Sequence, residues 1–283
     1  MIVGAHIRTH GGLPSVVPGA LAIGADAVQF FASNARMWRH PTISADAAAE
    51  FREACEAAGI RSAFLHAPYL VNIASPNPQF HARSIELSRA TLVAADALGA
   101  SGLVVHAGAG GRGEQREALA RAAAALDAIA EVDARADLVV ELMAGSSGAV
   151  ASTFAEAATL VEAAATGDRL RLCVDTCHLF AAGYALDDPA GVEACFAELR
   201  ASGLAGRLVA VHANDAAFPR GSRRDRHANI GTGGIGVDGF EAILARSEVA
   251  GCTVLCETPG DEETRRRDVA TQKELAPSAE TGR

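Results

Sequence analysis

The sequence predicts an α/β fold in one domain, a TIM (β/α)₈ barrel. Eight short apolar runs of strand type occur along the 283 residues, separated by stretches with helical periodicity. Six of the eight runs end in a histidine or a carboxylate, and the carboxyl ends of parallel strands converge on one face of a barrel. The length also suits a single barrel. A doubly wound open sheet is the alternative, but its ligands would gather at one switch point.

Each strand is predicted from a short run of apolar and β-branched residues, and each helix from apolar residues at i, i+3 and i+4. Ser44 is the expected N-cap of the second helix, and glycines such as Gly59 and Gly99 stand where a helix end needs positive φ. The predicted strands cover residues 2–7, 27–31, 63–67, 102–108, 137–143, 170–176, 207–213 and 252–257. The predicted helices cover residues 14–24, 44–58, 79–98, 114–132, 152–165, 188–200 and 238–246.

The barrel is expected to occupy residues 1–260, followed by residues 261–283 as a C-terminal extension. In this extension, residues 261–274 predict a polar helix, and the last nine residues have the composition of a disordered tail. The loops at 32–43, 68–78 and 214–237 are longer than usual for barrel connections. Because they follow strands, they lie on the predicted active face.

Composition excludes several classes of function. The net charge of −9 argues against a general nucleic-acid binder, although bound cations would reverse the field locally. We see no signal peptide and no apolar run of membrane-spanning length, so we predict a cytoplasmic protein without membrane contact. The six cysteines are interpreted as reduced core thiols, and nothing requires more than a monomer.

The polar residues at the strand ends predict a metal site. A lone histidine or glutamate there usually has an ordinary structural role, but the joint pattern is hard to explain by packing because buried charges are costly unless paired or metal-bound. His6, on the first strand, faces the same pocket and is interpreted as a supporting neighbour of the ligands. The candidate ligands are His66, His106, Glu141, Asp175, His178, His212, Asp225, His227 and Glu257.

Imidazole and carboxylate ligands without thiolate suit zinc, manganese or iron, and zinc is the simplest choice for hydrolysis. Nine ligands imply two or three ions, with one carboxylate bridging two of them. Two ions about 3.5–4 Å apart are the arrangement used for in-line displacement at phosphorus.

Several segments resemble one known family, the endonuclease IV family of zinc-dependent apurinic/apyrimidinic endonucleases. The resemblance covers about residues 1–260 in the order of the family, and the segments DTCHLFAAGY and DRHANIGTG are highly specific. The matching segments are GAHI…GG (4–12), QFFASNARMW (29–38), HAPYLVNIASP (66–76), VDTCHLFAAGY (174–184), HANDA (212–216), DRHANIGTGGIG (225–236) and CETP (256–259).

The resemblance implies a TIM barrel with three Zn²⁺ ions that cleaves double-stranded DNA 5′ to abasic sites. A metal-bridged hydroxide would attack the phosphorus and leave a 3′-hydroxyl and a 5′-deoxyribose phosphate. Mn²⁺ or Fe²⁺ could fill the same sites. Glu141 would be the catalytic bridging carboxylate. By resemblance, the first zinc would be held by His66, His106 and Glu141, the second by Glu141, Asp175, His212 and Glu257, and the third by His178, Asp225 and His227.

The resemblance also implies DNA-binding residues. Arg36, Tyr69 and Leu70 match positions that enter the base stack where the abasic nucleotide flips out, a gap that a guanidinium, an aromatic ring and an aliphatic wedge can fill. The alternative is that Tyr69 and Leu70 merely cover the barrel. Arginines 220, 223, 224 and 226 are either a solvated loop or phosphate contacts.

The chain departs from the family pattern at two places. Ala107 replaces a common proline after His106, and Leu142-Met143 replaces a usual Asn-Thr pair after Glu141. Both ligands remain, but a neighbouring polar group that could orient the metals or the phosphate is lost, and such losses typically cost about 10–100-fold in metal affinity or activity.

Two other functions remain open from the sequence. One is a sugar isomerase or epimerase of the xylose-isomerase type with divalent metal. The other is a non-catalytic, metal-binding protein that recognises DNA damage. The full set of nine ligands and the wedge residues favour the nuclease over both.

Overall fold

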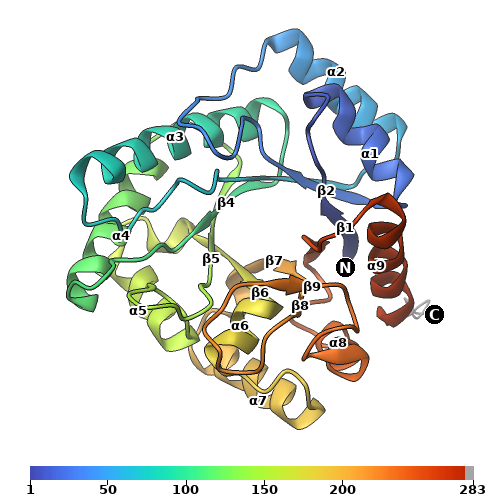
Figure 1. Ribbon diagram of the computed structural model, residues 1–283. Helices are drawn as coiled ribbons and strands as arrows, with labels where there is room; N and C mark the ends of the chain where they lie inside the picture. The colour runs from blue at the N-terminus through green and yellow to red at the C-terminus, as the bar shows by residue number, and fades with distance from the viewer. Residues whose placement is uncertain (278–283) are drawn as a thin grey trace.

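The computed structural model describes residues 1–277, and these form a closed barrel of eight parallel strands surrounded by helices (Figure 1). Neighbouring strands follow chain order around the barrel, and β1 pairs with β10 to close it, with Val3 opposite Val254. The predicted TIM barrel is therefore confirmed. The barrel strands are β1 (Ile2–His6), β2 (Ala27–Phe30), β3 (Ser62–His66), β4 (Gly102–His106), β5 (Asp137–Glu141), β6 (Arg171–Asp175), β7 (Leu208–His212) and β10 (Thr253–Cys256).

The helices cover the outside of the barrel, and they follow the strands as predicted. Ser44 caps α2 by accepting a hydrogen bond from the backbone N of Ala47 at 3.1 Å, which confirms the predicted N-cap. Three 3₁₀ turns, η1 (Leu13–Ser15), η2 (Gly167–Arg169) and η3 (Ala205–Arg207), link some of the elements. The α-helices are α1 (Val16–Ala22), α2 (Ala45–Ala57), α3 (Pro78–Ala97), α4 (Gln115–Ala130), α5 (Phe154–Ala163), α6 (Thr176–Ala182), α7 (Pro189–Ala201), α8 (Gly236–Leu244) and α9 (Glu262–Leu275).

Two features on the active face differ from the prediction. The strand predicted to reach residue 176 ends at Asp175, and α6 begins at the next residue. The Asp175 carboxylate caps this helix by accepting from the backbone N of His178 at 3.0 Å. The loop predicted at 214–237 contains a two-stranded antiparallel sheet, β8 (Asp215–Ala216) and β9 (His227–Ala228).

The inside of the barrel is filled at the amino ends of the strands and polar at their carboxyl ends. Seven residues form a separate apolar layer inside the barrel, and Gly4 lets β1 approach β2 so closely that a Cβ there would lie 1.9 Å from the Ala27 oxygen. Five of the six cysteines are buried thiols, as predicted. The inner layer consists of Ala27, Phe64, Val104, Val139, Cys173, Ala210 and Leu255.

The helix predicted at 261–274 corresponds to α9, which packs against the barrel beside β1 (Figure 1). Val269 is buried there, and Asp268 accepts hydrogen bonds from Asn229 and from the backbone N of Ile230. The division of the chain at residue 260 stays a prediction. Of the predicted disordered tail, residues 278–283 lie outside the described part. Within residues 1–277, every helix is too short or too polar to span a bilayer.

Candidate metal centre

The nine predicted ligands lie together where the barrel strands end. Five of them are the last residue of a strand, one follows β10, and three come from the segments after β6 and β7. The strand twist and the parallel pairing therefore place them on one face. In chain order they are His66 (β3), His106 (β4), Glu141 (β5), Asp175 (β6), His178 (α6), His212 (β7), Asp225 (the β8–β9 loop), His227 (β9) and Glu257 (after β10).

Several overlapping groups of these side chains could each hold a cation, because the ligand atoms of each group lie within 4.8 Å of one another, and three of the groups match the sets that the resemblance implies. The first two groups share Glu141, and we call them together the inner cluster. We call the third the rim group. The first group is His66, His106 and Glu141, the second is Glu141, Asp175, His212 and Glu257, and the third is His178, Asp225 and His227.

Glu141 is the centre of the inner cluster and is fully buried. Its Oε2 lies 3.0 Å from Nε2 of His66 and 3.2 Å from Nε2 of His106, while its Oε1 lies 3.1 Å from Nδ1 of His212. Burial opposes ionisation, but the charges of His212 and His106 outweigh it and hold the Glu141 pKa well below its usual range. Each carboxylate oxygen thus faces a different set of histidines, as a bridging ligand requires.

The rim group joins the inner cluster to the surface. His178 Nε2 lies 3.3 Å from Oδ2 of Asp225, and His227 Nε2 lies 3.2 Å from Oδ1 of the same carboxylate. The Asp225 side chain is half exposed, whereas His178 is buried. His227 Nε2 also lies 3.4 Å from Asp175 Oδ2, so the two regions are in direct contact.

Carboxylates strongly favour the protonated form of the rim histidines. Burial disfavours the charged form of His178, but Asp175 and Asp225 outweigh it and raise the His178 pKa to about 10. By the same balance, Asp175 and Asp225 raise the pKa of His227 to about 12. Burial opposes ionisation of Asp225, but the two histidines beside its carboxylate, His178 and His227, outweigh burial and lower its pKa. Positive charge in this site is therefore strongly stabilised, whether protons or metal ions carry it.

The donor set and one unpaired atom fit a bound cation. Among residues 1–277, the buried Nε2 of His227 meets no hydrogen-bond partner, since its approach to Asp225 lacks hydrogen-bonding geometry. A buried imidazole nitrogen without a partner is costly, and a metal ion would satisfy it. Nitrogen and carboxylate oxygen ligands suit zinc, manganese or iron. The residues present thus fit the metals that the sequence predicts.

Two residues that the sequence prediction missed hold candidate ligands, or the segment that follows them, in place. Asn214 is fully buried, donates to Oδ2 of Asp175 at 2.7 Å and accepts from the backbone N of Glu257 at 2.7 Å. Asp215 is also fully buried and accepts from the backbone N of Gly233 at 2.9 Å and of Ile235 at 2.9 Å. Both lie just after His212, so the HANDA segment carried the signal, although only its histidine was assigned.

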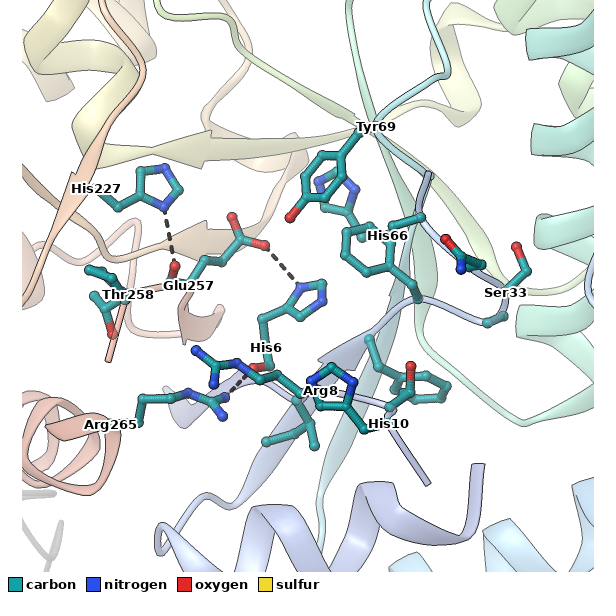
Figure 2. Close-up of a pocket in the computed structure, with 18 of the residues that line it drawn as sticks. His6, Arg8, His10, Ser33, His66, Tyr69, His227, Glu257, Thr258 and Arg265 are labelled. Carbon is teal, nitrogen blue, oxygen red and sulfur yellow. Dashed lines mark hydrogen bonds and ion pairs between the residues drawn. The ribbon is translucent and has the colours of Figure 1, made fainter. Parts of the chain in front are cut away.

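His6, predicted to be a supporting neighbour, contacts a ligand directly. Its Nδ1 lies 3.1 Å from Oε1 of Glu257, and Figure 2 shows the two side chains pointing toward each other, joined by a dashed line. Burial lowers the pKa of His6, so it is a neutral hydrogen-bond donor to Glu257. Gln29 contacts the same carboxylate and was not predicted.

The metal centre forms one end of a cavity of about 930 Å³. The cavity extends from the histidines towards the loops after β1 and β2, where Arg8, His10 and Ser33 line it (Figure 2). His10 had no role assigned from the sequence. A cavity of this size could admit one sugar-phosphate unit of a larger substrate.

The three predicted DNA-binding residues lie beside this cavity, and two of them are large apolar side chains at the surface. Tyr69 and Leu70 are 67% and 36% exposed, so part of each side chain is accessible to a bound substrate. Tyr69 lines the cavity, and its backbone N donates to the carbonyl of Ala35 at 3.1 Å. This hydrogen bond joins the loops after β2 and β3, so Arg36 is held next to the pair.

The arginine-rich segment has mixed contacts. Arg220 forms an ion pair with Asp187 at 3.0 Å, and the Arg224 guanidinium lies over the ring of Phe218 at 4.7 Å. Arg223 has a positive φ of 57°, a strained backbone for a side chain of this kind. Arg226 lines the cavity. Of these arginines, Arg226 is therefore the best placed to contact a substrate.

The two departures from the family pattern leave backbone contacts intact. Leu142 is fully buried, and its carbonyl accepts a hydrogen bond from Nδ1 of His178 at 2.8 Å. The backbone N of Ala107 donates to the carbonyl of Glu141 at 3.1 Å. The orientation of His178 therefore depends on a backbone atom, which the replacement of asparagine by leucine does not remove.

Comparisons with known proteins agree with this geometry. The xylose isomerase-like TIM barrel family matches residues 19–278. A protein of Streptomyces coelicolor named probable endonuclease 4 is 37% identical over 278 residues, which cover 96% of this chain and 94% of that protein. The crystal structure of endonuclease IV from Thermus thermophilus has a TM-score of 0.85 and 30% identity, and the match covers 97% of this chain and 98% of that chain.

The same barrel occurs in sugar-converting proteins. A D-tagatose 3-epimerase-like protein matches with a TM-score of 0.72, covering 97% of this chain and 95% of that chain. Its sequence identity is only 20%, so this likeness shows the fold alone.

Proposed function

The chain belongs to the endonuclease IV family, within the xylose isomerase-like TIM barrel proteins, and we infer from this that it is a metal-dependent DNA endonuclease. We propose that its substrate is double-stranded DNA with an abasic site, that it hydrolyses the phosphodiester 5′ to that site, and that the products are a 3′-hydroxyl and a 5′-deoxyribose phosphate.

We further propose three zinc ions, one for each group of ligands, with manganese or iron able to replace them. When bound, such ions lower the pKa of a water molecule and stabilise negative charge on the leaving oxygen. The observation that carries this proposal is the shared, fully buried Glu141, whose two oxygens face His66 on one side and His212 on the other.

The residues of the chain itself would position the DNA. Tyr69, which lines the cavity, and its exposed neighbour Leu70 are suited, together with Arg36, to fill the gap left by a flipped abasic nucleotide. Arg226, which lines the cavity, would contact a phosphate, because a guanidinium group can bind two phosphate oxygens at once. The positive charges of Arg36 and Arg226 would make this face locally attractive to DNA, although the chain as a whole carries a net negative charge. Action as a monomer and a cytoplasmic location remain part of this proposal.

The proposal is tested with two duplex oligonucleotides that differ only by one tetrahydrofuran abasic analogue. The zinc-loaded protein should nick the duplex that carries the analogue, directly 5′ to it, and leave the intact duplex uncut. A protein with bound zinc that binds the abasic duplex without cutting it would instead be a damage-recognition protein. Turnover of a ketose in place of nicking would show a sugar epimerase.

A further inference from the structure

Gln29, in β2, is a polar side chain that the proposed mechanism does not use. It is fully buried inside the barrel, where an unpaired amide would be costly. Its Nε2 donates to Oε1 of Glu257 at 2.7 Å, and its Oε1 lies 2.9 Å from Nε2 of His212. One amide thus contacts two proposed ligands of the same cation.

The orientation of this amide follows from its partners. The NH₂ group of Gln29 lies against the Glu257 carboxylate, with Nε2 2.7 Å from Oε1, and a carboxylate oxygen accepts the hydrogen bond that this group donates. The reversed amide would place two oxygens in contact there. The amide oxygen must therefore face His212 Nε2, and the only favourable contact is one in which that nitrogen donates its hydrogen.

The consequence is a fixed tautomer of His212. With the hydrogen held on Nε2, the free lone pair of the neutral ring is on Nδ1. Nδ1 is the nitrogen that faces the second group, 3.1 Å from Glu141 Oε1 and 3.5 Å from Glu257 Oε2. The lone pair is thus directed at the position where a cation would be held.

Gln29 constrains Glu257 in the same way. Oε1 of Glu257 receives hydrogen bonds from Gln29 and from His6 Nδ1, at 2.7 and 3.1 Å. The other oxygen, Oε2, is the one turned to His212 and the second group. Both contacts come from the first two strands of the barrel, whereas Glu257 and His212 belong to its last two.

We propose that Gln29 is a positioning residue that selects the Nδ1-binding tautomer of His212 and presents Oε2 of Glu257 to the same ion. The inference rests on the proposed metal binding but not on the DNA substrate. A ligand held by a hydrogen bond from a neighbouring side chain typically loses about 10–100-fold in metal affinity without that contact.

The test measures zinc affinity and the protonation of His212 in the full-length, zinc-loaded chain. Gln29→Met keeps the volume but removes both hydrogen bonds. Gln29→Glu keeps an acceptor for His212 Nε2 but replaces the donor to Glu257 by an oxygen, so it separates the two contacts. Thr253→Val is the matched control, because it removes a buried hydrogen bond to Ser62 at the opposite end of the barrel interior. Competition with a chelator gives the affinity, and ¹⁵N–¹H spectra of labelled histidine, assigned with His212→Ala, give the tautomer.

We expect Gln29→Met to bind the second zinc about 10–100-fold more weakly and to lose the protected Nε2–H signal of His212. Gln29→Glu should keep that signal, and Thr253→Val should match the wild type in both measurements. Zinc affinity within twofold of the wild type in Gln29→Met, with the His212 signal unchanged, would overturn the inference.

Neither readout uses DNA, so the two proposals can fail separately. A wild-type protein that binds zinc but does not nick abasic DNA would contradict the proposed function, and Gln29 would still be judged by the affinities. A wild-type protein that binds no zinc would overturn both.

Discussion

The inner cluster and the rim group meet at one cavity but are held in different ways. The inner ligands stand at the ends of barrel strands, and Glu141 and His212 are fully buried there. In the rim group, Asp225 comes from a loop and its side chain is half exposed. Ligands on a closed barrel are fixed by the sheet itself, whereas a ligand on a loop depends on side chains that hold the loop.

The structure supplies such side chains for the rim. Asp215 binds backbone N–H groups of the glycine-rich segment at 231–236, and Asp268 on α9 binds Asn229 and Ile230. Both carboxylates are buried, so the loop that carries Asp225 and His227 is tied down at its far end. The rim still depends on these side chains, whereas the inner cluster is fixed by the sheet. We therefore expect the inner cluster to retain its ions under a chelator that removes the ion from the rim.

The largest expected effect is at the shared carboxylate. Glu141→Gln removes the charge between the two inner groups, and we expect nicking of the abasic duplex to fall by about 10³-fold, the scale for losing a principal electrostatic group. Circular dichroism should show an intact fold. The control Glu131→Gln, at an exposed surface ion pair with Arg89, should retain full activity. Normal cutting by Glu141→Gln would contradict the proposal that the Glu141 carboxylate bridges two ions.

The next effect separates the rim from the inner cluster. In Asp225→Asn, the rim group loses its negative charge while Glu141 keeps its contacts. We expect one fewer ion per chain by metal analysis, and nicking reduced by about 10–100-fold. If this variant lost all its ions, the inner cluster and the rim group would be one cooperative site and not two separate ones.

Metal binding should depend on pH mainly at the rim group. The raised pKa values of His178, about 10, and His227, about 12, mean that both rings carry protons at neutral pH before metal binds. Metal binding needs neutral imidazole, so it should release protons and strengthen as pH rises. Calorimetry of zinc binding in two buffers with different ionisation enthalpies should show release of about two protons for the rim ion. Binding without proton release would contradict these pKa shifts.

The same groups make the stability of the metal-free fold depend on pH. The raised histidine pKa values stabilise the fold fully below their ordinary value of 6.5, and this contribution is lost as pH rises through the folded values. The lowered Asp225 pKa stabilises the fold above its ordinary value of 3.8 and is lost in acid. Thermal melts of the metal-free protein should therefore be highest between these limits.

The smallest expected effect is at the DNA wedge, outside both regions. Tyr69→Ala should reduce the preference for abasic over intact duplex by about tenfold, since stacking on an aromatic ring contributes roughly 1–3 kcal/mol per base. Fluorescence anisotropy on the two duplexes measures this preference. Leu21→Ala, a similarly exposed apolar residue on α1, is the control. If Tyr69→Ala kept the wild-type preference for abasic duplex, the Tyr69 ring would only cover the barrel and would not contact the DNA.

The barrel, and the strand ends at which the candidate ligands lie, could be predicted from the sequence because both depend on local patterns. Apolar runs mark the strands, and a polar residue at the end of a run is visible without knowing its partners. The α6 helix was missed because the apolar residues of β6 continue into it without glycine or proline, and only the Asp175 cap marks the change. The short β8–β9 sheet lacks any periodic signal.

Gln29 could not be predicted for a different reason. Its hydrogen-bond partners lie 183 and 228 residues away in the chain, at His212 and Glu257, and a single glutamine in an apolar strand gives no local sign of them. Asn214 stands beside a predicted ligand and could have been found from its position. Supporting residues are thus predictable when they neighbour a ligand in sequence, and otherwise only after the barrel has closed.

The number of metal ions per chain tests the central claim most directly. Elemental analysis of the purified protein, with the chain concentration measured independently, should give three ions, of which a mild chelator removes one and leaves two. That result would match an inner cluster built around Glu141 and a separate rim group. One ion or none per chain, under conditions that saturate the site with zinc, would contradict the account.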